Sequence, residues 1–168
     1  MAHELSERPP EADARSRLGD WEADTVVGRG SGPCLVTLVD RRSRFLAGGK
    51  ASAHGAEEVA RVETESLRGQ PLRSVTPDRG KEFARHACVT AELGVEFYLC
   101  RPRHPWERGT NENANGLVRE YFPKGTDFST VPDEDVRAVY DALNRGPRKC
   151  LGFRTPQEVH CSKTLHLV

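Results

Sequence analysis

Three acidic side chains occupy positions at which carboxylates could share a metal ion. Asp24 lies in the middle of an alternating segment, residues 20–28, where a charged side chain is unfavourable unless it has a partner. Asp78 follows a short apolar run and precedes a glycine and a helix start, a common place for a site in α/β proteins. Glu112 falls in the first turn of a predicted helix. Carboxylates held together repel one another, and divalent cations that prefer oxygen ligands relieve this repulsion.

Each of these acids also has a structural interpretation, and neighbouring acids compete for the same roles. Asp24 could be an exposed residue on a strand face, and Asp78 could cap the helix that follows it. Glu22 shares a strand face with Asp24 and is the main alternative for the first acid. Glu107 and Glu120 are alternatives for the third, although Glu120 lies two turns further on, about 12 Å along the helix axis.

The apolar pattern predicts a mixed sheet with helices packed on it. Three consecutive strands form a meander, and helices then alternate with two further strands, which is the element order of an α/β fold. The expected strands cover residues 20–28, 33–40, 45–50, 72–77 and 95–100. The expected helices cover residues 53–68, 81–93, 110–122, 132–144 and 156–160. We expect Ser52 and Thr110 to cap two of these helices.

The length and composition indicate one soluble globular domain. The chain has 168 residues, of which 36% are hydrophobic and 30% charged, which is sufficient for a sizeable core and unlike a disordered protein. We expect residues 19–160 to form the domain, residues 1–18 to form a loose linker or arm, and residues 161–168 to form a tail. The formal net charge of +0 argues mildly against a free-standing DNA-binding protein, so any DNA contact must come from local patches.

The cysteines and the hydropathy of the chain indicate the cellular compartment in which the protein is expected. The five cysteines are odd in number and form no CxxC pair, which predicts reduced, mostly buried thiols in a cytoplasmic protein. No spacing of histidines and cysteines supports a zinc site. The absence of a long apolar run predicts that there is no signal peptide, membrane span or membrane partner.

A long run in the second half of the chain carries a family signature. Residues 106–129, WERGTNENANGLVREYFPKGTDFS, resemble the signature of bacterial insertion-sequence transposases of family thirty. Three other segments resemble the same family in matching order: GDWEADTVVG, SVTPDRGKEFARH and LNRGPRKCLGFRTPQEV. The resemblance runs from about Ser6 to Val159, so it is far more specific than a single short motif.

The resemblance implies a ribonuclease-H-like catalytic domain, with a mixed five-stranded sheet and helices on both faces. It also implies DNA strand cleavage and strand transfer during transposition, by an Asp–Asp–Glu triad that binds two Mg²⁺ or Mn²⁺ ions. Asp24 matches the first catalytic acid, Asp78 the second, and Glu112, which lies 34 positions after Asp78, the third. By the same resemblance, Asp24 is expected to contact both ions, Asp78 one of them and Glu112 the other. The family has an N-terminal helix-turn-helix region as well, which we expect this chain to lack.

Basic and amide side chains around the predicted site are candidates for DNA contacts. Arginine suits phosphate recognition because its guanidinium donates two parallel hydrogen bonds. The candidates are Arg79, Lys81, Arg101, Arg103, His104, Arg108, Asn115, Arg119 and Lys124. An ordinary polar loop is the alternative interpretation of residues 101–108. The expected partners are DNA, both element ends and target, and further copies of the chain in the active complex.

Two functional hypotheses from different classes follow. An active transposase catalytic domain is favoured by the complete triad. A truncated or domesticated remnant that binds DNA or partner subunits without catalysis is favoured by the neutral charge and by the expected lack of a recognition region. A structural-RNA nuclease of the same fold is a weaker third hypothesis, because nothing in the chain selects RNA.

Overall fold

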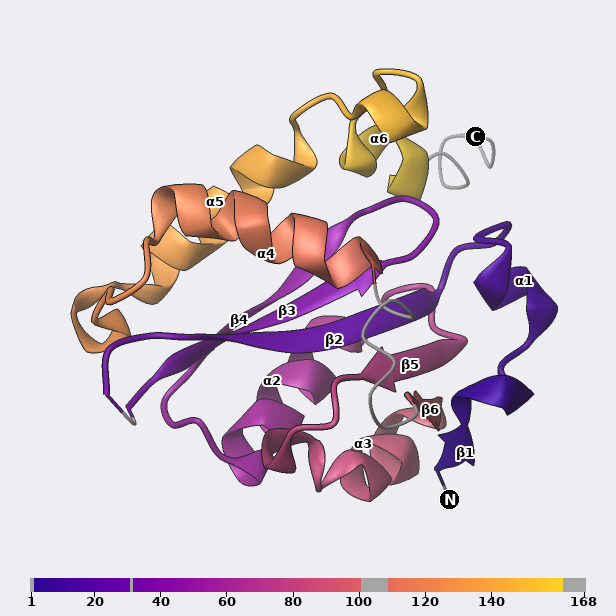
Figure 1. The fold of residues 1–168 in the computed structure, drawn as a ribbon, viewed down its shortest axis with the longest axis horizontal. Coiled ribbons are helices and arrows are strands. Elements are labelled where there is room, and N and C mark those ends of the chain that lie inside the picture. Colours follow the sequence, from indigo (N-terminus) through magenta and orange to yellow (C-terminus); the bar gives the residue numbers. More distant parts are fainter. Residues whose placement is uncertain (1, 31, 101–108, 162–168) are drawn as a thin grey trace.

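A mixed β-sheet with helices on both faces forms the core of the computed structural model (Figure 1). The structure describes residues 2–30, 32–100 and 109–161. Within these residues, six strands form one sheet in the order β1-β6-β5-β2-β3-β4. The strands are β1 (His3–Glu4), β2 (Asp20–Val27), β3 (Cys34–Asp40), β4 (Leu46–Ala51), β5 (Ser74–Pro77) and β6 (Glu96–Leu99). The five predicted strands are confirmed as β2 to β6, and β1 is a sixth that the sequence pattern did not predict.

Strand β2 lies at the centre of the sheet and joins its antiparallel and parallel halves. It pairs antiparallel with β3, which pairs antiparallel with β4. On its other side it pairs parallel with β5, and β5, β6 and β1 continue as parallel neighbours. All seven residues of β3 are buried, as expected for a strand that helices cover on both faces.

The helices divide between the two faces of the sheet (Figure 1). Their bounds are α1 (Pro10–Asp13), α2 (Ala56–Leu67), α3 (His86–Leu93), α4 (Gly109–Tyr121), α5 (Asp133–Asn144) and α6 (Pro156–Cys161). Helices α2 and α3 pack on one face together with Trp21 and Ala23 of β2. Helices α4 and α5 pack on the other face together with Val26. The predicted alternation of inward faces along β2 is therefore confirmed.

The N-terminal residues are packed against the sheet. Leu5, Ala12 and Leu18 are buried, and β1 pairs with β6. A 3-10 turn (Leu5–Glu7) and α1 connect β1 to β2. The expectation that this arm is loose is wrong, because a few apolar contacts and strand pairing hold an otherwise polar segment. The division between an arm and a domain at residue 19 stays a prediction.

Two helices begin differently from what their sequences predicted. Helix α2 has Gly55 at its N-cap, and the Ser52 hydroxyl instead donates a 2.7 Å hydrogen bond to Glu58. Helix α4 begins at Gly109, so Thr110 lies inside the helix and does not cap it. The Ser52 hydroxyl is thus used by a residue six positions further along the chain, and the Thr110 hydroxyl accepts a tertiary hydrogen bond from Arg44.

Helix α6 is attached to the sheet through His160. This buried imidazole lies with Nδ1 2.9 Å from the Ser43 hydroxyl and Nε2 2.9 Å from Oε1 of Gln70. Its ring also stacks on Phe45, with ring centroids 4.3 Å apart. Burial lowers the pKa of His160. These contacts bring the C-terminal part of the described chain back onto the turn that follows β3.

Two further predictions concerned the burial of the cysteine thiols and the absence of a membrane span. The five cysteines all lie among the described residues, and none of them forms a disulfide bond there. Cys34 and Cys100 are buried but Cys88 and Cys150 are exposed, so the prediction of mostly buried thiols is wrong. Among the helices in the part of the chain that the structure describes, none has both the length and the apolar composition needed to cross a membrane.

Candidate active site

Asp24 lies on β2, and Asp78 directly follows the neighbouring strand β5 at the same level of the sheet. Parallel pairing aligns Ala23 of β2 with Pro77 of β5, so the next residue on each chain is one of the two acids. The backbone N–H of Asp78 continues the pairing with a 3.0 Å hydrogen bond to the carbonyl of Ala23. Both acids are half-buried. Strand β5 ends here while β2 continues, which leaves the two carboxylates at the end of a parallel strand, where α/β proteins place their sites.

Asp78 does not cap a helix. The chain after it forms a 3-10 turn (Lys81–Phe83), and α3 begins only at His86. The carboxylate of Asp78 accepts a 2.7 Å hydrogen bond from the adjacent backbone N–H of Arg79. The capping interpretation of this acid is therefore wrong.

Helix α4 packs along β2 through polar contacts as well as apolar ones. The Asn115 amide nitrogen donates to Oδ2 of Asp24 at 3.1 Å, and the Asn115 amide oxygen accepts from the Thr37 hydroxyl at 2.8 Å. Further along, Nη2 of Arg119 donates to the carbonyl of Val27 at 2.9 Å. The backbone N–H of Thr25 donates to the other Asp24 oxygen at 2.8 Å. These contacts fix the register of α4 on β2 and orient the carboxylate of Asp24.

Glu112 lies on the side of α4 that carries these contacts. Residues three and seven positions apart share a helix side, so Glu112 forms one stripe with Asn115 and Arg119. Its side chain is exposed. Among the described residues, no three His, Cys, Asp or Glu side chains gather closely enough to hold a metal ion. That Asp24, Asp78 and Glu112 come together around metal ions stays a prediction.

The rival acids occupy different surroundings. Glu22 is 0% exposed and both its oxygens accept hydrogen bonds, one from Arg41 and one from the backbone N–H of Asn111. A carboxylate committed in this way is a poor metal ligand, so Asp24 stays our candidate for the first acid. Glu120 is exposed near the far end of α4, and Glu107 lies outside the described residues.

A second polar cluster beside Asp24 was not predicted from the sequence. The Thr25 hydroxyl donates to Oε1 of Glu82 at 3.2 Å and lies 3.3 Å from Nε2 of His54. His54 and Glu82 are 3.4 Å apart. A Cβ at Gly80 would lie 2.0 Å from the Glu82 carboxylate, so the absence of a side chain there lets this acid fold back toward β2. The sequence feature that could have indicated this cluster is Glu82, an acidic residue four positions after Asp78.

The predicted DNA-contacting residues fall into three groups. Arg79, Lys81 and Lys124 are exposed, although Nε of Arg79 also donates to the carbonyl of Cys100. Asn115 and Arg119 are half-buried and engaged with β2 and β3 as described above. The remaining candidates lie outside the described residues: Arg101, Arg103, His104 and Arg108. Contact with DNA stays a prediction for each of these residues.

The sequence of this chain matches a known protein family. The family described as "Integrase core domain" matches residues 14–105, which is more than half of the chain. The chain belongs to this integrase core family. Its members depend on divalent metal ions. The predicted relationship to insertion-sequence transposases is also confirmed by the relatives below.

Several transposases are similar over most of the chain. The transposase of IS4351 from Bacteroides fragilis is 40% identical over 92% of this chain and 48% of its own length. The IS1086 transposase from Cupriavidus metallidurans is 42% identical over 90% of this chain and 46% of its own length. The InsI transposase of IS30A from Escherichia coli K12 is 41% identical over 92% of this chain and 41% of its own length. This chain thus spans less than half the length of these relatives.

Solved structures show the same fold at low sequence identity. The catalytic core domain of BIV integrase has a TM-score of 0.67 and 16% identity, covering 88% of this chain and 96% of that one. A chain of the simian T-cell lymphotropic virus intasome, solved with the PP2A regulatory subunit B56 gamma, has a TM-score of 0.68 and 18% identity. That match covers 84% of this chain and 54% of the other. The predicted ribonuclease-H-like fold is therefore confirmed.

Proposed function

We propose that this chain is the catalytic domain of a DNA transposase that cleaves DNA strands and transfers them during transposition. The observation that carries the proposal is the pairing of β2 with β5, which sets Asp24 and Asp78 side by side where a parallel strand ends. Membership of the integrase core family and the similarity to insertion-sequence transposases support the same reaction.

The chemistry of the candidate ligands suits hard divalent cations. The candidate ligands, Asp24, Asp78 and Glu112, offer carboxylate oxygens only, and such ligands suit Mg²⁺ or Mn²⁺. We propose that these three carboxylates would hold the ions. When bound, such ions would neutralise charge on the scissile phosphate and favour deprotonation of the attacking hydroxyl.

The residues around Asp24 prepare it for this role. Hydrogen bonds from the Asn115 amide to one carboxylate oxygen and from the backbone N–H of Thr25 to the other orient the group. Thr37 in turn fixes the Asn115 amide so that its nitrogen, and not its oxygen, points at Asp24. An uncharged amide and a backbone N–H thus orient the carboxylate of Asp24.

We predict that Asn115→Ala slows metal-dependent cleavage by about 10–100-fold, the usual effect of losing a side chain that orients a metal ligand. Asn113→Ala is the matched control, because Asn113 is an exposed amide on the same helix. Single-turnover rates with a labelled duplex measure the effect. Equal rates for the two variants would show that the bond to Asp24 has no part in the reaction.

We also propose that the segment 101–108 binds the DNA backbone without reading sequence. Replacing Arg101, Arg103 and Arg108 with alanine should weaken binding to any duplex about equally. It should also reduce the salt slope of log Kd by up to ~0.9 per lost phosphate contact. Element-end and scrambled duplexes titrated at several salt concentrations measure both effects.

The control for this triple variant removes the same charge elsewhere. Arg137, Arg145 and Arg154 are exposed on or after α5, and replacing them with alanine should leave the salt slope unchanged. Equal slopes for the two triple variants would contradict the assignment of the 101–108 segment. A strong preference of the unmodified chain for the element end would show that sequence recognition lies within this domain.

The proposed reaction is tested directly with a labelled duplex that carries an element end. We expect nicking, and joining of the free 3′ end to a second duplex, with Mg²⁺ or Mn²⁺ and neither with EDTA. Binding without nicking under all metal conditions would instead support the second hypothesis, a non-catalytic DNA-binding or oligomerisation module. Related intasomes are oligomers, and we propose a cytoplasmic homo-oligomer on DNA for this chain as well.

A further inference from the structure

We propose that Glu22 and Arg41 are positioning residues that hold the first turn of α4, and with it Glu112, at a fixed place relative to Asp24. The proposal rests on the proposed function for the role of Glu112. The interactions of Glu22 and Arg41 stand independently of it, and they join α4 to three other parts of the chain: β2, the turn after β3, and the N-terminal segment.

The first contact is between β2 and the start of α4. Oε2 of Glu22 accepts a 2.9 Å hydrogen bond from the backbone N–H of Asn111, in the first turn of the helix. N–H groups in a first helical turn have no partner within the helix, and a carboxylate there also meets the positive end of the helix dipole. Glu22 is 0% exposed, so water cannot replace it. A side chain from a distant strand therefore caps the first turn of α4.

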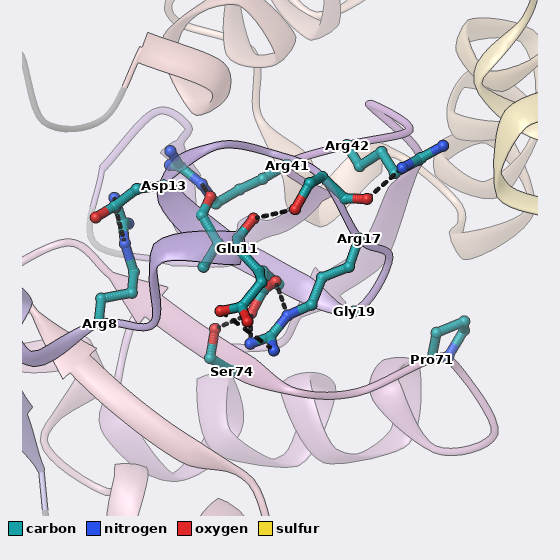
Figure 2. Close-up of polar contacts among 12 residues, drawn as sticks. Arg8, Glu11, Asp13, Arg17, Gly19, Arg41, Arg42, Pro71 and Ser74 are labelled. Atoms are coloured by element: carbon teal, nitrogen blue, oxygen red, sulfur yellow. Dashed lines mark hydrogen bonds and ion pairs between the residues drawn. The ribbon is translucent and has the colours of Figure 1, made fainter.

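The second contact holds Glu22 itself in place. Arg41 is buried, its Nη1 donates to the other oxygen of Glu22, and its Nε donates to the carbonyl of Ala12 at 3.0 Å. The backbone N–H of Arg41 is bonded to the carbonyl of Asp20 at 2.8 Å. Figure 2 shows Arg41 within the polar network between the N-terminal segment and the sheet. The ion pair is thus buried and hydrogen-bonded on both sides, the condition under which a buried pair gives a defined geometry.

A third contact reaches the same helical turn from the same loop. Nη1 of Arg44 donates a 2.7 Å hydrogen bond to the hydroxyl of Thr110, which is 4% exposed. Arg44 has a φ of 62°, a left-handed conformation that non-glycine residues seldom adopt without compensating contacts. The turn after β3 therefore holds consecutive residues of α4, Thr110 directly and Asn111 through Glu22.

These contacts together set the register of α4 on β2. Glu22 and Asp24 are two positions apart on one face of β2, and they bond to Asn111 and Asn115, which are one helical turn apart. A slip of the helix would break both bonds at once. Glu112 follows Asn111 directly, so the buried pair fixes the residue next to the proposed third acid.

The test uses a variant that removes the pair without leaving a buried charge, Glu22→Met with Arg41→Met. Replacing both partners by apolar residues of similar volume is the change that folded proteins tolerate best at a buried ion pair. We expect amide hydrogen exchange in residues 109–113 to rise at least about tenfold in the DNA-free protein, as local opening becomes easier. We also expect kcat for cleavage to fall about 10–100-fold with KM for the duplex within about twofold, since positioning and not DNA binding is lost.

Arg8→Met is the matched control. Arg8 is a buried arginine of the same N-terminal network and bonds to Asp13 and Thr76, but it has no bond to α4. It should leave both the exchange of residues 109–113 and kcat near their original values. If the double variant does not fold, Glu22→Gln, which keeps the shape of the side chain but removes its charge, should give changes in the same direction of about threefold or more.

The two readouts separate this inference from the function on which it rests. Unchanged exchange in residues 109–113, with unchanged kcat, would overturn the positioning role even if the protein is an active transposase. An equal rise in KM and fall in kcat/KM with constant kcat would also overturn it. Faster exchange in a protein that never cleaves DNA would leave the structural coupling standing and reject the proposed function instead.

Discussion

Replacing Asp24 with asparagine should abolish metal-dependent DNA cleavage by this protein and leave its fold intact. A neutral amide fills the volume of the carboxylate but cannot neutralise two cations. We expect a loss of about 10³-fold or more in the single-turnover rate, equivalent to about 4 kcal/mol of transition-state stabilisation. The fold should tolerate the change because the position is only half-buried and the new amide oxygen can accept one of the two hydrogen bonds, from Asn115 or from the backbone of Thr25. Circular dichroism and melting temperature check this second expectation.

The matched control is Asp141→Asn, which makes the same chemical change at an exposed position on α5. It should cleave at the original rate. Because Glu22 is fully buried and already bonded at both oxygens, it cannot readily substitute for Asp24. Retained cleavage by Asp24→Asn would therefore reject the two-metal mechanism and would not simply move the first acid to Glu22.

The third acid can be identified in the same assay. Glu112 shares its side of α4 with Asn115, whereas Glu120 lies two turns further along the helix. Glu112→Gln should lose cleavage, and Glu120→Gln should retain it. The opposite result would mean that α4 meets the DNA in a register different from the one that the contacts with β2 define.

The sequence predicted the sheet well because period-two alternation is a property of the strand itself. Trp21 and Ala23 face one core and Val26 faces the other, as the pattern along β2 indicates. It could not predict β1, since two residues carry no measurable pattern. It also misjudged the N-terminal arm, where the decisive interactions, such as Arg41 with the carbonyl of Ala12, join residues far apart in the chain.

The sequence likewise predicted some features of the candidate site and missed others. The type and order of the acids were visible in the sequence, but their adjacency depends on β5 lying beside β2, which spacing alone does not establish. Thr110 was predicted to cap α4 from its local sequence. That sequence gives no information about Glu22, a distant residue whose carboxylate bonds to the first turn of α4. Errors of this kind arise where a tertiary contact supplies what a local motif would otherwise supply.

Glu63 provides a prediction about stability that no sequence motif suggested. It lies on the sheet-facing side of α2 and is 1% exposed. Its Oε1 has no hydrogen-bond partner among the described residues. Because burial disfavours the charged form, it raises the pKa of the Glu63 carboxyl to about 8. The folded protein therefore holds Glu63 in its neutral form near neutral pH, whereas the unfolded chain ionises it.

The direction of the pH dependence follows from these two pKa values. Below about pH 4.5 the group is protonated in both states and imposes no penalty on folding. Between about pH 4.5 and 8 the unfolded state releases the proton and the folded state retains it, so stability falls as pH rises. Above about pH 8 both states are ionised and the loss is complete. Its size is on the order of 3–5 kcal/mol, at about 1.4 kcal/mol for each unit of pKa difference.

Glu63→Gln should remove this dependence, because an amide of the same shape does not titrate. The free energy of unfolding in urea, measured from pH 4.5 to 8.5, should fall more steeply for the original protein than for the variant. The two curves should converge near pH 4.5, and the variant should be the more stable protein at pH 8. Glu65→Gln is the matched control on the same helix: Glu65 is exposed and paired with Arg61, so its removal should change stability by less than about 1 kcal/mol. Parallel curves for Glu63→Gln and the original protein would show that the buried carboxyl finds a partner that stabilises its charge.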